Sequence, residues 1–251
     1  MQDRYAGDIG DFGKFALLRE LQEQGLVIGI NWYKTEQSSA KQDDGKYWIT
    51  EELAKCNQEL ASELWDVYPS PSERDKRSIE ALEKKKLING DLYFHDLVPF
   101  DGREEWHQRA LKKLAGANLV FLDPDNGMVV PSAEKNKRKR IKYVLDEEVR
   151  SYLCNSKSVL IYQHRPRRKE AEYIEEMTQR FLKLKENLQR DDIRVITFPR
   201  YSVRDYFAIS VNEDHREKIS RAFENMLSGA WGSGPRPMCR IPKSDFGIRG
   251  V

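Results

Sequence analysis

The chain has 251 residues, a formal net charge of +2 and 33% charged residues. This length is enough for one large core, and the near-neutral charge means that nucleic-acid binding has to be argued from where the basic residues lie. No apolar run approaches the roughly 20 residues of a membrane span, which argues against a membrane protein. The three cysteines are isolated and the first ten residues lack a signal-peptide pattern, so we expect a cytoplasmic protein without a disulfide framework or a Cys-rich metal site.

A glycine-rich segment lies near the start of the chain. YAGDIGDFGK at 5–14 leads into an apolar stripe at helical spacing, which predicts a helix through about residue 24. Three glycines beside a helix start let backbone N–H groups face an anion or another ligand. The segment precedes the first strand and lacks the G-x-G-x-x-G spacing, so its spacing alone leaves a ligand role and a structural role open.

Strand and helix patterns alternate after this segment. Strands are predicted at 26–33, 92–97, 119–122 and 158–162, and helices at about 50–66, 73–88, 103–115, 143–154 and 171–188. Two further strands at 193–198 and 206–211 are close enough for a hairpin, and a last helix includes 219–227. This order predicts one α/β domain over 1–251, with a mainly parallel, Rossmann-like sheet, a C-terminal antiparallel hairpin strand and a loop-rich tail at 229–251.

The stretch NLVFLDPDNGM at 118–128 is the strongest candidate for a site. Its apolar run is typical of a buried strand, and the polar side chains after it would lie where a central strand ends. Ligands of open α/β sheets bind at the carboxyl ends of the strands. Aspartate and asparagine are also ordinary turn residues, but two carboxylates and an amide on one tight turn favour a site. The catalytic candidates are Asp123, Pro124, Asp125 and Asn126.

Two basic runs follow later strands. KNKRKRIK at 135–142 comes after the Asp-Pro turn, and QHRPRRK at 163–169 ends the strand at 158–162. Such runs are often solvated surface, but both should lie at the edge that carries Asp123 and flank one mouth. The nucleic-acid-binding candidates are Lys137, Arg138, Lys139, Arg140, Arg165, Arg167 and Arg168.

The predicted strand order ends like the sheet of S-adenosylmethionine-dependent methyltransferases. Tyr5–Lys14 resembles the N-terminal motif of the large-subunit ribosomal RNA adenine methyltransferase J family, which is approximately H-A-G-N-x-A-D-x-x-K. The match covers Ala6, Gly7, Asp11 and Lys14, and Asp8 stands in place of the asparagine.

Two further segments are similar to motifs of that family. LVFLDPDNG at 119–127 resembles its Asp-Pro-Pro-Tyr strand end at Asp123 and Pro124, and Gly45-Lys46-Tyr47 is similar to its Gly-Arg-Tyr. Asp125 and Asn126 replace the second proline and the tyrosine, so the aromatic platform for a flipped base is missing from its usual place.

The resemblance implies methylation of adenine N6 in nucleic acid, with S-adenosylmethionine as cofactor. The Asp123 carboxylate and a proline carbonyl would accept hydrogen bonds from the exocyclic amine, so that positioning supplies most of the acceleration. Asp96 would lie beside the adenine of the cofactor. The implied cofactor-binding residues are Gly7, Asp8, Gly10, Lys14, Gly45 and Asp96.

Two other functions fit the same residues. In a metal-dependent phosphodiesterase or nuclease, Asp123 and Asp125, with Asp96 or Glu36, would bind Mg²⁺ and the basic runs would bind the phosphodiester. A nucleotide-binding protein without catalysis is the third alternative, because a fold alone does not fix function. The sequence gives neither the exact substrate nor the oligomeric state.

Overall fold

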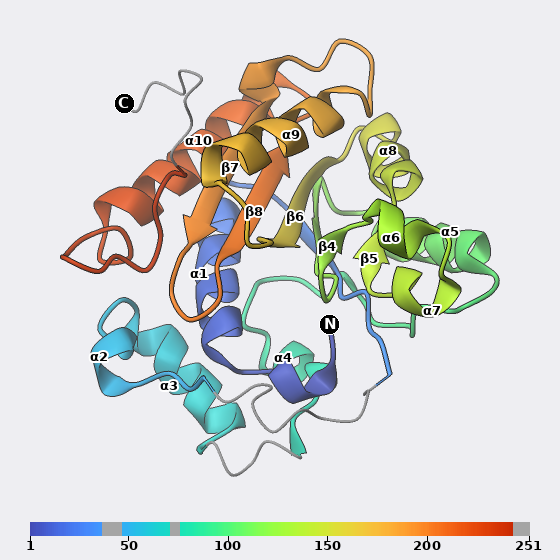
Figure 1. The fold of residues 1–251 in the computed structure, drawn as a ribbon. Coiled ribbons are helices and arrows are strands. Elements are labelled where there is room, and N and C mark those ends of the chain that lie inside the picture. The colour runs from blue at the N-terminus through green and yellow to red at the C-terminus, as the bar shows by residue number, and fades with distance from the viewer. Residues whose placement is uncertain (37–46, 71–75, 243–251) are drawn as a thin grey trace.

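A six-stranded sheet forms the centre of the protein, as seen in a computed structural model that describes residues 1–36, 47–70 and 76–242 (Figure 1). In spatial order its strands are β2 (Tyr93–Phe94), β1 (Ile28–Asn31), β3 (Leu119–Leu122), β6 (Ser158–His164), β8 (Arg204–Ile209) and β7 (Ile193–Phe198). β1, β2, β3 and β6 are parallel, and β8 is antiparallel to both of its neighbours. The predicted fold class is therefore confirmed.

Two layers of helices cover the sheet (Figure 1). One layer consists of α1 (Ile9–Glu23), α3 (Gln58–Val67), α4 (Ile79–Lys85) and α10 (Glu213–Ser228). The other consists of α5 (Arg103–Lys113), α8 (Asp146–Cys154) and α9 (Glu170–Leu182). Alternate side chains of β3 enter the two cores: Leu119 and Phe121 pack in the first, and Val120 and Leu122 in the second.

Several elements differ from the predictions in their bounds. The helix expected at 50–66 is divided into α2 (Glu51–Ala54) and α3, and α9 ends at Leu182 rather than near residue 188. The turn after β3 contains elements that were not predicted. They are the strand β4 (Gly127–Met128), which pairs in parallel with β5 (Tyr143–Val144), and the short helices α6 (Pro131–Glu134) and α7 (Lys137–Arg140).

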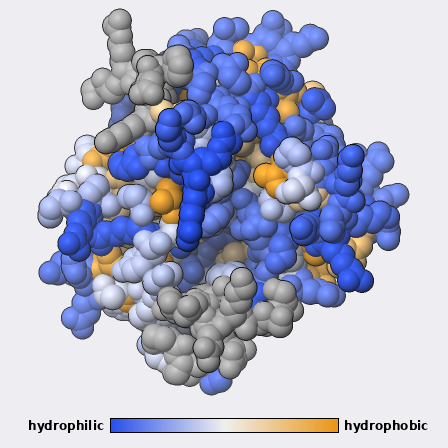
Figure 2. All heavy atoms as spheres, in the orientation of Figure 1, coloured by the Kyte–Doolittle hydropathy of each residue, from blue (hydrophilic) through white to orange (hydrophobic). Residues whose placement is uncertain are grey.

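The parallel strands bring their carboxyl ends to one edge of the sheet. The antiparallel β8 begins at that edge, where Arg204 pairs with His164, the last residue of β6. The start of α1 lies at the same edge, because its Lys14 contacts Asp123 just after β3. The face of the molecule that carries this edge is largely hydrophilic (Figure 2). None of the helices in the described part of the chain has both the length and the apolar composition that crossing a membrane requires.

Candidate active site at the carboxyl edge of the sheet

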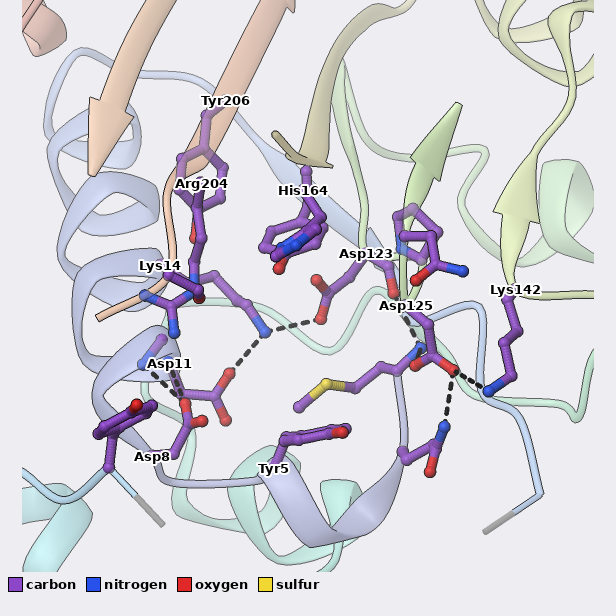
Figure 3. A pocket seen from close by; sticks show the side chains of 18 residues that line it. Tyr5, Asp8, Asp11, Lys14, Asp123, Asp125, Lys142, His164, Arg204 and Tyr206 are labelled. Carbon is purple, nitrogen blue, oxygen red and sulfur yellow. Dashed lines mark hydrogen bonds and ion pairs between the residues drawn. The ribbon is translucent and has the colours of Figure 1, made fainter. Parts of the chain in front are cut away.

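A cavity of about 340 Å³ opens at this edge (Figure 3). Side chains from both ends of the chain line it, among them Asp8 and Lys14 from the N-terminal segment, Asp123 after β3, and Arg204 and Tyr206 on β8. Cavities of about 300 Å³ and larger bind small ligands. This cavity is therefore the candidate active site, and it lies where the sequence predicted one.

Lys14 connects the two predicted motifs inside the cavity. Its Nζ lies 2.6 Å from Asp123 Oδ2 and 2.5 Å from Asp11 Oδ1, and all three side chains are buried. The Oδ1 atom of Asp123 has no hydrogen-bond partner among the described residues. The ammonium therefore fixes one oxygen of the Asp123 carboxylate and leaves the other available to a ligand.

Burial and charge act against each other in this cluster. Burial opposes the charge of Lys14, but Asp11 and Asp123 outweigh it and raise the pKa of the ammonium well above its usual range. Burial raises the pKa of the Asp123 carboxyl, and Lys14 offsets part of that rise. Lys14 thus stays charged, and Asp123 is a stronger hydrogen-bond acceptor than an exposed aspartate would be.

The start of α1 is shaped by its glycines and aspartates. Asp8 caps the helix, since its Oδ1 accepts hydrogen bonds from the N–H groups of Gly10 at 2.6 Å and Asp11 at 3.1 Å. The N–H of Gly7 donates to Asp11 Oδ2 at 2.7 Å, which orients that carboxylate toward Lys14. The N–H groups of Gly7, Gly10 and Asp11 thus bind the protein's own carboxylates, and that of Ile9 donates to the carbonyl of Tyr47, so this helix start is not an open anion site.

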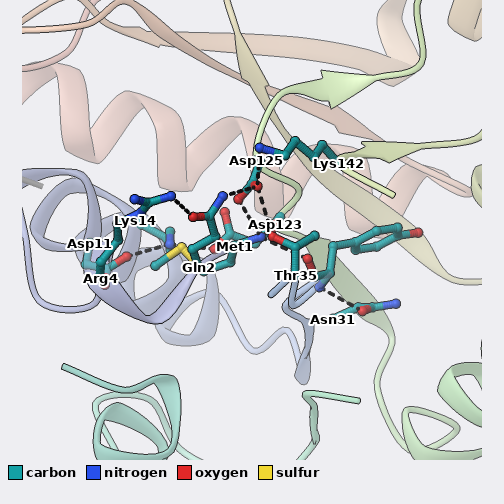
Figure 4. A network of polar contacts seen from close by, with 11 residues as sticks. Met1, Gln2, Arg4, Asp11, Lys14, Asn31, Thr35, Asp123, Asp125 and Lys142 are labelled. Carbon is teal, nitrogen blue, oxygen red and sulfur yellow. Dashed lines mark hydrogen bonds and ion pairs between the residues drawn. The ribbon is translucent and has the colours of Figure 1, made fainter. Parts of the chain in front are cut away.

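Asp125 faces a different set of partners (Figure 4). Its Oδ2 accepts hydrogen bonds from Gln2 Nε2 at 2.8 Å and Thr35 Oγ1 at 3.0 Å, and Lys142 Nζ lies 4.0 Å away. The Met1 amino group donates to the backbone oxygens of Tyr33, after β1, and Asp123, after β3. Residues 1 and 2 thus occupy the crevice between β1 and β3, where the strand order reverses direction.

The turn after β3 depends on one glycine. Gly127 has φ +108°, and a Cβ there would lie 2.2 Å from Gln163 Oε1, which accepts a hydrogen bond from the N–H of Met128 at 2.8 Å. The N–H of Asn126 donates to the carbonyl of Lys142 at 3.1 Å. Pro124 and Asn126, two of the catalytic candidates, line the cavity beside Asp123.

The predicted cofactor residues divide into three groups. Asp8, Gly10 and Lys14 line the cavity, whereas Gly7 does not line it but donates its N–H to Asp11, which does. Asp96 does not line it: its carboxylate is exposed and lies 3.1 Å from Arg109 Nε. The reason is that β2 ends at Phe94, three residues earlier than the strand predicted at 92–97, so Asp96 lies in the segment after the strand. Gly45 lies outside the described residues.

One group of cavity-lining side chains, four tyrosines and an arginine, was not among the residues predicted from the sequence. Tyr5, Tyr47, Tyr162, Tyr206 and Arg204 all line the cavity. Burial raises the pKa of Tyr162 to about 12, so its hydroxyl stays neutral. The predicted hairpin contained the signal for Arg204 and Tyr206, because an antiparallel strand beginning at the carboxyl edge carries its first residues to the site.

The basic residues also divide. α7 is exposed, and two of its side chains form ion pairs: Lys137 with Asp101, and Arg140 with Glu147 at 3.1 Å. Arg167 is exposed, and exposed Arg168 pairs with Glu176 at 2.7 Å. Arg165 is different, because its side chain is only 6% exposed and is held by Asp205 and Glu170. It ties β6 to β8 and α9 and is not presented to a nucleic acid.

The metal-dependent alternative requires carboxylates that converge on one cation, and the described residues do not provide this arrangement. No group of three or more His, Cys, Asp or Glu side chains in the described ranges is placed to bind a metal ion. Asp123 is turned toward Lys14, and Asp125 toward Gln2 and Thr35. A divalent cation needs several oxygen ligands that converge on one point.

No model of a known protein family matches the chain, and no curated protein is similar enough in sequence to be counted as a relative. Geometry and the motif resemblance therefore carry the functional assignment.

Proposed function

We propose that the protein is an S-adenosylmethionine-dependent methyltransferase acting on nucleic acid, with the N6 amine of adenine as the first candidate acceptor. One observation carries this proposal: Lys14 of the N-terminal motif donates to Asp123 of the strand-end motif at 2.6 Å. The two segments that resemble the methyltransferase family thus meet in one cavity, although 109 positions separate these residues. If the resemblance of either segment were accidental, there would be no reason for Lys14 and Asp123 to be in contact.

Asp123 is suited to orient an amine. It is buried at the end of a central strand, Pro124 stiffens the backbone after it, and Lys14 fixes Oδ2. Its Oδ1 would accept a hydrogen bond from an exocyclic amine and so direct the nitrogen lone pair. A side chain whose direction is set before the ligand arrives loses little entropy when it aligns a reactant.

The charges of the cavity fit the implied cofactor. Carboxylates and cations balance there: Asp8, Asp11, Asp123 and Asp125 face Lys14, Lys142, Arg204 and the Met1 amino group, which lies 3.1 Å from Asp125 Oδ1. A cavity with groups of both signs suits a ligand that itself carries both, as S-adenosylmethionine does on its ammonium, sulfonium and carboxylate. When bound, this cofactor supplies an electrophilic methyl group. Tyr5 and Tyr47 offer rings that an adenine or a base can stack on.

The size of the cavity limits what it holds at once. Its 340 Å³ lies near the lower end of the range for a single small ligand of about 300–1,000 Å³. Cofactor and acceptor base together therefore also need the mouth of the cavity, beside half-buried Ser202 and the partly exposed Tyr47. The base enters the site from that side.

A methyl-transfer assay tests the proposal. Purified protein is incubated with S-adenosylmethionine carrying a labelled methyl group and with total RNA or DNA, and the modified nucleosides are identified by mass spectrometry. We expect label in N6-methyladenine. Asp123→Asn keeps the shape of the side chain, so it should lower the rate at least about a hundredfold while cofactor binding persists.

Asp96→Asn is the matched control, because it makes the same change on an exposed carboxylate outside the cavity. It should leave the rate unchanged. Full activity of Asp123→Asn would reduce Asp123 to a turn former and end the proposal. Hydrolysis of the nucleic acid that depends on Mg²⁺ would favour the nuclease, and binding of a nucleotide without any reaction would favour the non-catalytic alternative.

A further inference from the structure

A second cavity of about 400 Å³ lies beside the candidate active site, between α2 and the segment at 230–238. Lys55, Arg200 and Arg236 line it, against the single carboxylate of Glu52. None of these three cations has an ion-pair partner in the part of the chain that the structure describes. Unpaired cations around a hollow are the arrangement expected for binding phosphate groups.

A small cavity of about 10 Å³ lies between this basic cavity and the candidate active site. It shares Gly10, Arg204 and Tyr206 with the active-site cavity, and Arg200 and Met238 with the basic cavity. The three hollows therefore lie in a row. In Figure 1 the β7–β8 connection runs beside the N-terminal end of α1, above α2. Arg200 on this connection and Gly10 in α1 both line the small cavity.

The β7–β8 connection places three consecutive side chains along the row. Arg200 lines the basic cavity, Ser202 lines the active-site cavity, and Tyr201 between them is 49% exposed. The Tyr201 ring packs on that of Tyr47, which is 37% exposed, with ring centroids 4.6 Å apart. Tyr201 also has φ +65°, a conformation that is uncommon for a residue other than glycine and often marks a functional site.

We propose that a single strand of nucleic acid crosses the Tyr47–Tyr201 pair, with one base in the active-site cavity and the backbone phosphates at Lys55, Arg200 and Arg236. The proposal rests on the proposed function and names the form of its substrate. Exposed aromatic rings beside a cationic groove are the pattern by which proteins bind single strands, since every base has a face to stack. Bases paired within a duplex do not present their faces to such a pair, and a base must leave its stack to enter the cavity.

Binding of fluorescent oligonucleotides, measured by anisotropy over a range of salt concentrations, tests the electrostatic part. The double variant Arg200→Ala/Arg236→Ala should bind a single strand more weakly. It should also lower the slope of log affinity against log salt by about 0.7 for each phosphate that is no longer neutralised, or about 1.4 for two phosphates. Lys112→Ala/Lys113→Ala removes the same charge from exposed positions on α5, in the opposite layer, and should keep the wild-type slope.

The aromatic pair is tested with Tyr201→Ala and Tyr201→Phe. Removal of the ring should weaken binding of a single strand about tenfold or more, while phenylalanine keeps the stacking face and should bind like the wild type. Both variants keep a side chain at the positive φ, so backbone strain does not separate them. Equal binding by the alanine and phenylalanine variants, an unchanged salt slope in the arginine variant, or preference of the wild type for duplex would each overturn the inference.

These outcomes are separate from a failure of the proposed function. Oligonucleotide binding is measured without cofactor, so it remains informative even if S-adenosylmethionine does not bind. Conversely, cofactor binding and methyl transfer that are unaffected in the arginine and tyrosine variants would leave the proposed function standing while the strand path is rejected.

Discussion

Lys14 Nζ and Asp123 Oδ2 lie 2.6 Å apart, one residue on the first helix and the other directly after the third strand of the sheet. Lys14 also holds Asp11, so one buried ammonium neutralises part of the charge of two buried carboxylates. The start of α1 and the end of β3 meet only in the folded chain. The same ion pair therefore stabilises the fold and positions Asp123 in the candidate site.

Lys14→Met should be costly for stability. The substitution leaves Asp11 and Asp123 buried without their shared cation, and removing one partner of a buried ion pair costs about 3–5 kcal/mol. Chemical denaturation measures the free energy of unfolding. The double variant Lys14→Met/Asp11→Asn should recover part of the loss, because one of the two stranded charges is gone. Wild-type stability of the single variant would show that the cluster is not as buried as described.

Gly127→Ala should destabilise the turn that carries Asp125 and Asn126. Its Cβ would lie 2.2 Å from Gln163 Oε1 on a backbone with φ +108°, so both Gln163 and the turn must move. We expect a loss of about 3 kcal/mol or more in the free energy of unfolding. Gly25→Ala has a similar φ of +84° with no atom within 4 Å, and it isolates the conformational strain, about 1–2 kcal/mol. Equal losses in the two variants would contradict the predicted clash.

Much of the fold followed from periodicity. β3 and β7 begin and end where the apolar pattern predicted, and the hairpin of β7 with β8 is present. Apolar runs of strand length alternate along the chain with longer segments of helical periodicity. Each of these patterns can bury its apolar side chains in only one kind of element, a strand or a helix. The sequence placed Lys14 and Asp123 in two motifs of the same resemblance, and it placed Asp123 at the edge where strand ends gather. In the structure the two side chains meet at that edge through a hydrogen bond.

The features that the sequence did not predict are short strands and ion pairs formed between segments that are distant in the sequence. β4 and β5 consist of two residues each and exist through their pairing with each other, so neither has a period of its own. Arg165 belonged to a basic run, yet buried Asp205 on the facing strand draws it inward. Asp96 was predicted at the end of a strand, but its carboxylate pairs with Arg109, outside the cavity. Charge partners of this kind come from the tertiary fold, which local patterns do not contain.

The stability of the protein should fall as the solution becomes mildly acidic. Burial lowers the pKa of His107, whose ring nitrogens have no hydrogen-bond partner among the described residues, and burial lowers those of His164 and His215 in the same direction. The unfolded chain therefore binds protons near the ordinary histidine pKa of about 6.5 that the folded chain does not bind. Stability should decrease as the pH falls below about 6.5, until the folded pKa values are reached.

His107→Phe isolates the contribution of one histidine. It retains an aromatic ring against Tyr152 and removes the titrating group, so its free energy of unfolding should depend less on pH than that of the wild type, over the range just below about pH 6.5. The residual slope reports His164 and His215 together with the carboxylates. A slope identical to that of the wild type would mean that His107 accepts its proton without unfolding.

The central claim is that the cavity between α1, β3 and β8 binds S-adenosylmethionine, and thermal unfolding of the wild type with and without this cofactor tests it most directly. A ligand at about a hundred times its Kd stabilises the folded state by about 2.7 kcal/mol, which corresponds to a rise in Tm of roughly 5–10 °C for a chain of this size. We predict such a rise with S-adenosylmethionine and with S-adenosylhomocysteine. No rise with either compound, together with a rise in the presence of Mg²⁺ or of a nucleotide alone, would contradict the account.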